Sequence, residues 1–427
     1  MLLVTIAFII FLVIGMPVAF AIGISGTLFF LQHPNLPITI PIQLAISQTQ
    51  NFALLAVPMF IFAGNLMNES GITQRLLNLA AVLTGHMRGG LAQITVALAA
   101  LMGGVSGSCI ADASMEARIL GTEMIKKGYN RGFVAGIVSY ASLIVTTIPP
   151  GIGLILYGTV GQVSVGRLFA GGIAPGLLMT FFLMIAVSIS ARIRGYAPQR
   201  ERRANLGEIL SALVSGIWAA LFPIILLLGL RMGLFTPSEV GAFAVVYAAA
   251  VGLIAYRELT WDRFKLALRN TVLDVGAVMF IIALSGIFGY GIVWDRIPQV
   301  IADFLLGLST NPNVLLFIII VFLIIAGMFV DGSVLILMLT PIFLPIALQV
   351  GLDPVHFGLI FVIVVTMGNM TPPVGAAMYA VCSILDCPLN EFVKESIPFL
   401  ITIIVLLVVL IYFPNIVLYL PNLMFGK

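Results

Sequence analysis

Small polar residues occur in two groups, and each group includes a segment that ends in paired prolines. The first group, at residues 103–108 and 146–150, contains glycine, serine and threonine. The second group, at residues 331–333 and 368–373, has a similar composition. Hydroxyl and backbone carbonyl oxygens suit a hard cation such as Na⁺, and the NH groups of a helix N-terminus attract an anion. The two groups therefore predict ion binding.

The candidate residues form two cation sites and one solute site. The first predicted sodium site consists of Gly103, Ser106, Gly107, Thr146 and Thr147. The second predicted sodium site consists of Gly332, Ser333, Gly368, Asn369, Met370 and Thr371. The residues expected to contact an anionic solute are Ser106, Ser108, Asp331 and Gly332. The alternative is that these hydroxyls only donate to carbonyls one turn earlier in their own helices, which is common.

The composition places these residues inside a membrane. Of 427 residues, 61% are hydrophobic and 9% are charged, against roughly 25% charged residues in soluble domains. A soluble globular protein is therefore excluded, and the lipid bilayer is expected to cover most of the surface. The basic residues do not form a stripe interleaved with aromatic residues, so no nucleic acid is expected as a partner.

Hydrophobic runs of different lengths predict the elements that position the polar residues. Runs of about 20 residues predict ordinary spans, at residues 2–31, 52–68, 168–191, 209–231, 238–256, 272–293 and 396–420. The run 314–352 would make a helix of about 58 Å, nearly twice the bilayer core. It and the similar run 91–127 predict re-entrant helical hairpins. Residues 131–162 and 356–386 predict spans broken at paired prolines.

Polar segments separate these spans. Four of them are expected to be amphipathic arms on the membrane surface, or else simple loops, at residues 33–51, 69–89, 257–271 and 294–312. Residues 196–208 form a basic cytoplasmic linker that divides the chain. The first predicted repeat covers residues 1–195, and residues 209–427 hold an extra span plus the second repeat.

The basic residues predict sidedness. We place the runs 91–127 and 314–352 as hairpins that enter and leave the membrane on the same side. All but four of the 20 Lys and Arg residues then lie at the cytoplasmic face. The exceptions are Arg167, Arg231, Arg296 and Lys427. This layout predicts a cytoplasmic N-terminus and a periplasmic C-terminus.

The two halves contain similar motifs in the same order. Residues 105–108 match residues 330–333 at an offset of 225, and residues 147–153 match residues 370–376 at an offset of 223. Helices broken at matching places in an inverted repeat are typical of secondary transporters. We therefore expect an all-α polytopic membrane protein with an inverted repeat, two re-entrant hairpins and two Pro-broken helices.

Three of the acidic residues within the hairpins are candidates for a functional role. Asp331 is the only charged residue of its run, which makes it a candidate for contact with solute or cation. It could instead cap the helix that follows. Asp112 and Glu116 lie one turn apart near Arg118. They could pair with a scaffold or carry protons, but capping and internal salt bridges are the expected roles.

Parts of the pattern also fit an ion channel or an intramembrane protease. An ion channel could share the hydropathy but has less reason to carry paired hairpins. Residues 104–107 also match the G-x-S-G pattern of rhomboid-type intramembrane serine proteases. Such a protease needs a histidine base, and the only later histidine, His356, begins its span near the outer surface. The sequence therefore favours a transporter and no enzyme.

The order of motifs resembles one family across essentially the whole chain. The matching segments are Gly15-Met16-Pro17, Pro58-Met59-Phe60, Gly107-Ser108, Ile148-Pro149-Pro150, Thr236-Pro237-Ser238-Glu239 and the run 369–375. They resemble the large membrane subunit, DctM type, of tripartite ATP-independent periplasmic (TRAP) transporters.

This resemblance implies a function, a fold and partners. It implies Na⁺-coupled import, with two or more sodium ions, of a carboxylate such as sialic acid or a C4-dicarboxylate across the bacterial inner membrane. A periplasmic substrate-binding protein would deliver the solute, and a small four-helix membrane subunit would hold the scaffold. The implied fold is of the ion-transporter-superfamily type with an elevator mechanism, in which the hairpins and broken helices move.

Overall fold

The protein is helical throughout the part described. The structure is a computed structural model that describes residues 1–105 and 107–426. Within these residues there is no strand, and seven helices are long and apolar enough to cross a membrane, or eight if one bent pair counts as a single span. The all-α polytopic fold predicted from the composition is confirmed.

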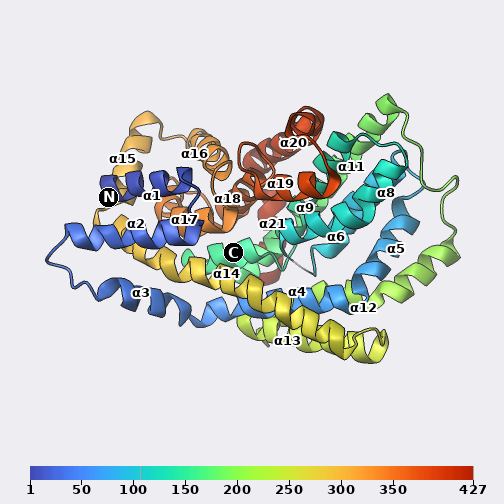
Figure 1. Cartoon of the computed structure of the whole chain (residues 1–427), viewed down its shortest axis with the longest axis horizontal. Coiled ribbons are helices and arrows are strands. Elements are labelled where there is room, and N and C mark those ends of the chain that lie inside the picture. The colour runs from blue at the N-terminus through green and yellow to red at the C-terminus, as the bar shows by residue number, and fades with distance from the viewer. Residues whose placement is uncertain (106, 427) are drawn as a thin grey trace.

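The first apolar run forms two helices, so the prediction of one span over residues 2–31 is wrong. α1 covers Leu2–Val13 and α2 covers Val18–Gln32, and they lie side by side (Figure 1). Gly15, with a φ of +86°, adopts the left-handed backbone that glycine reaches most easily. Pro17 has no NH with which to continue α1. These two residues break a run that is otherwise apolar enough for one long helix.

A contact at the N-terminus of α1 concerns the orientation of the chain in the membrane. The Met1 amino group forms an ion pair with Asp295 at 2.5 Å, and Asp295 follows the last residue of α14 (Trp261–Trp294). The spans predicted from the sequence place these two residues on opposite membrane faces. Their contact requires one face, which follows if α1 and α2 do not form the single span predicted at residues 2–31. The orientation of the N-terminus stays a prediction.

One group of helices, which we call the scaffold, includes α14 and the helices connected to it through α4 (Ala56–Glu69) and α13 (Pro237–Ala250). Its members are α4, α5 (Ile72–Thr84), α12 (Leu206–Arg231), α13 and α14. α13 packs on α4, α12 packs on α5, and α14 packs on α4 and α2. Chain segments from both halves of the sequence therefore make one packed group.

One predicted arm is continuous with the long helix α14. The helix is capped by Thr260 and is 34 residues long. Residues 261–275 contain no glycine or proline that would interrupt it. The segment predicted as a surface arm at 257–271 is therefore helical from Trp261 and continuous with the apolar part of α14, and it is not a simple loop. The other three predicted arms each contain a helix and are not simple loops: α3 (Ile40–Thr49), α5 and α15 (Ile297–Leu308).

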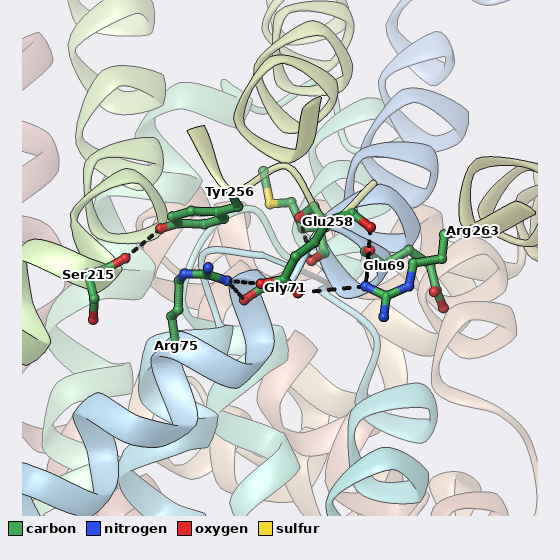
Figure 2. Close-up of polar contacts among 9 residues, drawn as sticks. Glu69, Gly71, Arg75, Ser215, Tyr256, Glu258 and Arg263 are labelled. Carbon is green, nitrogen blue, oxygen red and sulfur yellow. Dashed lines mark hydrogen bonds and ion pairs between the residues drawn. The ribbon is translucent and has the colours of Figure 1, made fainter. Parts of the chain in front are cut away.

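Figure 2 shows the polar contacts that join the two halves of the scaffold. Arg75 of α5 donates to Glu258 at 2.7 Å and to the Gly71 carbonyl at 2.9 Å. Its guanidinium lies 3.7 Å from the centre of the Tyr256 ring. Glu258 also pairs with Arg263 at 3.6 Å. Charge, hydrogen bonding and stacking thus bind the turn after α4 to the turn before α14.

The predicted hairpins and broken helices occupy the other part of the fold (Figure 1). The first hairpin consists of α6 (Gly90–Met102), α7 (Cys109–Glu116), a π-helical turn (Ala117–Gly121) and α8 (Thr122–Lys126). The first broken helix consists of α9 (Arg131–Thr147) and α10 (Ile152–Val160). The second hairpin consists of α16 (Pro312–Gly327) and α17 (Gly332–Gln349). The second broken helix consists of α18 (Pro354–Gly368) and α19 (Ala376–Leu385). All four breaks lie at the predicted Gly or Pro motifs.

The last predicted span is displaced. α20 covers Leu389–Tyr412, and a separate helix, α21, covers Asn415–Phe425. The prediction of one span at 396–420 is therefore wrong at both ends. Pro414 cannot donate the hydrogen bond that would continue α20 past Tyr412.

The linker after α11 (Val165–Arg194) is attached to the base of the first hairpin. Tyr196 stacks on Tyr129 with ring centres 4.1 Å apart. Burial raises the pKa of Tyr129 to about 12, so its phenol is neutral at physiological pH. The backbone NH groups of Gln199 and Arg200 both donate to the Gly85 carbonyl at 2.9 Å. The segment predicted as a divider between halves is thus held against the folded chain.

Candidate functional site

The tip of the first hairpin lies on the break of the first broken helix. A Cβ added to Gly103 would come within 2.6 Å of the Ile148 side chain, and one added to Gly107 would overlap the Pro150 carbonyl. Gly107 also has a φ of +65°. Only glycine allows this close approach, because any side chain would separate the tip from the break. The structure therefore brings together the two segments of the first predicted sodium site.

The first break frees carbonyl oxygens. α9 and α10 are inclined by 47°. Pro149 and Pro150 have no NH, so the carbonyls of Val145 and Thr146 lose the donor that a continuous helix would supply. The hydroxyls of Thr146 and Thr147 donate to the Leu143 carbonyl at 3.0 and 2.8 Å. The back-bonding alternative is thus present, but each hydroxyl oxygen keeps lone pairs that can bind a cation.

Two predicted residues of the first tip remain to be placed. Ser106 lies outside the described residues. Ser108 caps α7, accepting a hydrogen bond from the Ala111 NH at 3.5 Å. Ser108 therefore stands at the positive end of a helix, where an anion is also favoured.

The tip of the second hairpin packs on the second break in the same way. A Cβ on Gly327 would lie 3.0 Å from the Gly368 Cα, and one on Gly332 would lie 3.3 Å from the Val365 carbonyl oxygen. The Val374 NH donates to the Met328 carbonyl at 3.0 Å. These contacts bring the two segments of the second predicted sodium site together.

Asp331 caps α17. Its Oδ1 accepts a hydrogen bond from the Ser333 NH at 2.9 Å. Asp331 therefore has the capping role that was the alternative to contact with solute or cation. Asp331 remains half-buried, and its second oxygen is not used by this bond. Capping does not prevent a second contact, because an ionised carboxylate has about four acceptor positions.

The carbonyls of the second break are already occupied. The Gly368 carbonyl accepts from the Thr371 NH and hydroxyl, both at 3.0 Å. The Asn369 carbonyl accepts from the NH groups of Ala377 and Met378 at 3.0 and 3.2 Å. A carbonyl oxygen has two lone pairs, so both atoms are saturated in this conformation. A cation at the second predicted site would have to displace these donors.

The two halves meet at Cys109 and Asn369. The Asn369 Nδ2 donates to the Cys109 Sγ at 3.7 Å, which joins the second break to the first tip. Asp331 and Asp112 both lie within electrostatic range of Cys109. The packing is reciprocal, because α19 contacts α7 and α10 contacts α17. Sequence reasoning missed Cys109, whose only signal was its position directly after Ser108.

The remaining acidic prediction is corrected by the structure. Glu116 is 0% exposed, and among the described residues neither of its carboxylate oxygens has a hydrogen-bond partner. Arg118 is exposed and forms no described ion pair with it. The internal salt bridge expected for Glu116 is therefore wrong.

The protease alternative finds no support in the position of His356. Its Nε2 lies 2.8 Å from the Leu410 carbonyl, and the residue is 3% exposed. It belongs to the first turn of α18, while the break follows the last turn. Twelve residues of helix separate His356 from Gly368, a distance of about 18 Å.

This arrangement of helices is also found in two solved membrane transporters. It is similar to the YdaH transporter of Alcanivorax borkumensis, with a TM-score of 0.60 over 87% of each chain and 14% identity. It is also similar to MtrF of Neisseria gonorrhoeae, with a TM-score of 0.54 over 87% of this chain and 84% of that chain, and 15% identity. At these identities the similarity concerns the fold alone.

The chain belongs to the tripartite ATP-independent periplasmic transporter family, DctM component, whose sequence model matches residues 5–416. The sialic acid TRAP transporter large permease SiaM of Vibrio cholerae is 34% identical, over 96% of both chains. The C4-dicarboxylate large permease DctM of Pseudomonas aeruginosa is 35% identical, over 94% of both. The 2,3-diketo-L-gulonate large permease YiaN of Escherichia coli is 33% identical, over 94% of both. The resemblance noted in the sequence is confirmed.

Proposed function

We propose that this chain is the large membrane subunit of a Na⁺-coupled importer of an organic carboxylate and is not an enzyme. The observation that carries the proposal is the packing of each hairpin tip on a Pro-broken helix, with the first tip joined to the second break by the Cys109–Asn369 contact. Non-helical backbone at membrane depth must be satisfied by protein, water or ligand. Four such interruptions packed together therefore support a binding site.

The first sodium ion would bind between the first tip and the first break. The proposed ligands are Gly103, Ser106, Gly107, Thr146 and Thr147. Support comes from the close packing of tip on break and from the two carbonyls that the prolines leave without their helical donors. No acidic residue belongs to this set, which suits a monovalent cation held by neutral oxygens.

The second sodium ion would bind between the second tip and the second break. The proposed ligands are Gly332, Ser333, Gly368, Asn369, Met370 and Thr371. Because the Gly368 and Asn369 carbonyls each accept two hydrogen bonds, binding here requires the N-terminus of α19 or Thr371 to shift. This site would consequently be occupied in a conformation other than the one described.

The solute would be an anion held between Ser108, Asp331, Gly332 and Ser106. The N-termini of α7 and α17 lie at the two tips, and helix N-termini favour a carboxylate. Asp331 itself repels an anion, so its contact with solute would be through a hydroxyl or through a bound cation. The relatives are named for sialic acid, C4-dicarboxylate and 2,3-diketo-L-gulonate, and their identities lie too close together to choose among them.

The proposed mechanism is an elevator. The hairpins and broken helices would move together as one unit past a scaffold stabilised by the Arg75–Glu258 contacts. A small four-helix membrane subunit and a periplasmic substrate-binding protein would complete the transporter in the bacterial inner membrane. The basic linker would lie on the cytoplasmic side and the C-terminus on the periplasmic side.

A reconstitution assay tests the function. The chain would be placed in liposomes with its small subunit and binding protein, and an inward Na⁺ gradient would be imposed. We expect carboxylate accumulation that stops when the gradient is dissipated or the binding protein is omitted. Uptake that ignores the gradient would refute sodium coupling, and conductance without binding protein would favour a channel.

A further inference from the structure

The first hairpin contains a pair of buried carboxyl groups that the proposed sodium sites do not use. Asp112 and Glu116 lie one turn apart on α7 and are 1% and 0% exposed. Residues four positions apart share one face of a helix, and these two interact electrostatically. Two acidic groups are thus held together inside the fold.

The environment of Glu116 supplies no compensating charge. Among the described residues, no donor reaches either of its oxygens. The elements packed on α7 are α9, α19 and the π-helical turn. Their titratable groups are Arg118, Arg131, Tyr140, Tyr379 and Cys382. Arg118 and Arg131 are exposed, and Arg131 donates to the Asp386 carbonyl at 2.9 Å.

An ionised carboxylate cannot remain in such a place. Burial of an unpaired charge costs several kcal/mol even after relaxation, and a second negative charge nearby adds to that cost. Either a metal ion or a proton must therefore neutralise Glu116. The described residues contain no group of three His, Cys, Asp or Glu side chains that could hold a metal ion. A proton needs no ligands beyond the carboxylate itself.

We infer that Asp112 and Glu116 form a proton-binding site inside the first hairpin, with the proton on Glu116 in the conformation described. Binding converts the Glu116 carboxylate and one proton into a neutral carboxylic acid. Loss of the proton returns a second negative charge to the pair, so the site releases it only when water or a cation gains access.

The position of the pair connects it to the tip. α7 begins at Cys109, which contacts Asn369, and Glu116 lies seven residues, or about 10 Å, further along the same helix. The π-helical turn follows Glu116 directly, and such turns often occur at functional sites. Proton exchange would therefore act on the helix that carries the first tip. This consequence for transport, unlike the proton itself, rests on the proposed function.

Infrared spectroscopy of the purified transporter complex tests the proton directly. We expect the wild type at neutral pH to show the C=O stretch of a buried protonated carboxyl, and Glu116→Gln to lack it. Glu123→Gln is the control, because the Glu123 side chain on α8 is 46% exposed and pairs with Lys127 at 3.5 Å. A wild type without the band, or a band that persists in Glu116→Gln, would overturn the inference.

Thermal stability separates a proton from a sodium ion. Glutamine has the shape of a neutral glutamic acid, so Glu116→Gln should keep the wild-type melting temperature and any stabilisation by Na⁺. Loss of Na⁺ stabilisation in this variant would show that a metal ion occupies the pair, and would overturn the inference. If Glu116→Gln does not fold, Asp112→Asn replaces it. The band must then persist, because Glu116 keeps its proton.

Uptake measurements test the link to transport. Under a fixed Na⁺ gradient, we expect the uptake rate of the wild type to vary with pH and that of Glu116→Gln to be flat, within twofold of the wild-type maximum. An equal pH profile in both would overturn the exchange of this proton during transport. If no uptake occurs in any variant, the proposed function fails while the infrared result still decides the proton.

Discussion

Gly327 and Gly368 lie backbone to backbone where the second hairpin meets the second broken helix. A Cβ on Gly327 would be 3.0 Å from the Gly368 Cα, and a Cβ on Gly368 would overlap the backbone of Gly327. A rotamer change could not relieve either overlap, because the obstructing atoms belong to the backbone of the other glycine. The packing of tip on break therefore depends on both glycines.

Replacement of Gly368 by alanine should separate the second tip from its break. Overpacking of a tight site costs about 1–3 kcal/mol. We expect Gly368→Ala to lower the melting temperature of the purified protein and to abolish uptake. Gly289→Ala is the matched control, because nothing lies within 4 Å of a Cβ at that helical position. Equal stability of the two variants would contradict the close approach.

The Arg75–Glu258 contact should stabilise the scaffold. Arg75 combines an ion pair, a carbonyl hydrogen bond and a stacked tyrosine, and the two charged side chains are 26% and 38% exposed. Solvent screening reduces the ion-pair contribution, so we expect Arg75→Ala to destabilise the protein by about 1–2 kcal/mol. Thermal unfolding at low and high salt would measure it.

Two further variants sharpen that measurement. Arg75→Lys keeps the charge but loses the planar fork and should fall between wild type and Arg75→Ala. Lys265→Ala removes a pair whose members are 56% and 89% exposed, and should change stability by less than about 0.5 kcal/mol. If Arg75→Ala behaves like Lys265→Ala, the contact contributes nothing beyond an ordinary surface pair.

Asp331→Asn separates capping from charge. Asparagine caps a helix about as well as aspartate, so α17 should remain intact. If Asp331 acts on solute or cation, uptake should fall at least about tenfold, a free-energy change of about 1.4 kcal/mol, with unchanged membrane expression. Asp353→Asn is the control, since Asp353 caps α18 far from both tips. Normal uptake by Asp331→Asn would leave the carboxylate with a capping role alone.

Thr147→Val tests the first sodium site. Valine keeps the shape of threonine but has no oxygen, so the Na⁺ concentration for half-maximal uptake should rise about tenfold. The same α9 helix supplies a control in Ser142→Ala, which removes a buried hydroxyl that donates to the Ser139 carbonyl at 2.8 Å. Unchanged Na⁺ dependence in Thr147→Val would mean that its hydroxyl only bonds the Leu143 carbonyl.

The breaks in the helices could be predicted because their causes are local. Pro149, Pro150, Pro372 and Pro373 lack an NH wherever the chain places them, and the glycines at residues 103–107 weaken any helix. The same reasoning predicted one span over residues 2–31, although Gly15 and Pro17 divide this run into two helices. It also placed the start of α14 too late, because amphipathic residues 261–271 continue a helix that the scaffold contacts support.

The amino-acid sequence by itself determined that the chain is a helical membrane protein, where its long runs break, and which oxygens could form ion sites. Those properties follow from composition and from the backbone chemistry of glycine and proline. Only the tertiary structure decided that Asn369 donates to Cys109, that Arg75 stacks on Tyr256, and that Glu116 lies buried without a donor among the described residues. Each depends on side-chain packing between helices, and sequence periodicity does not specify which helices become neighbours.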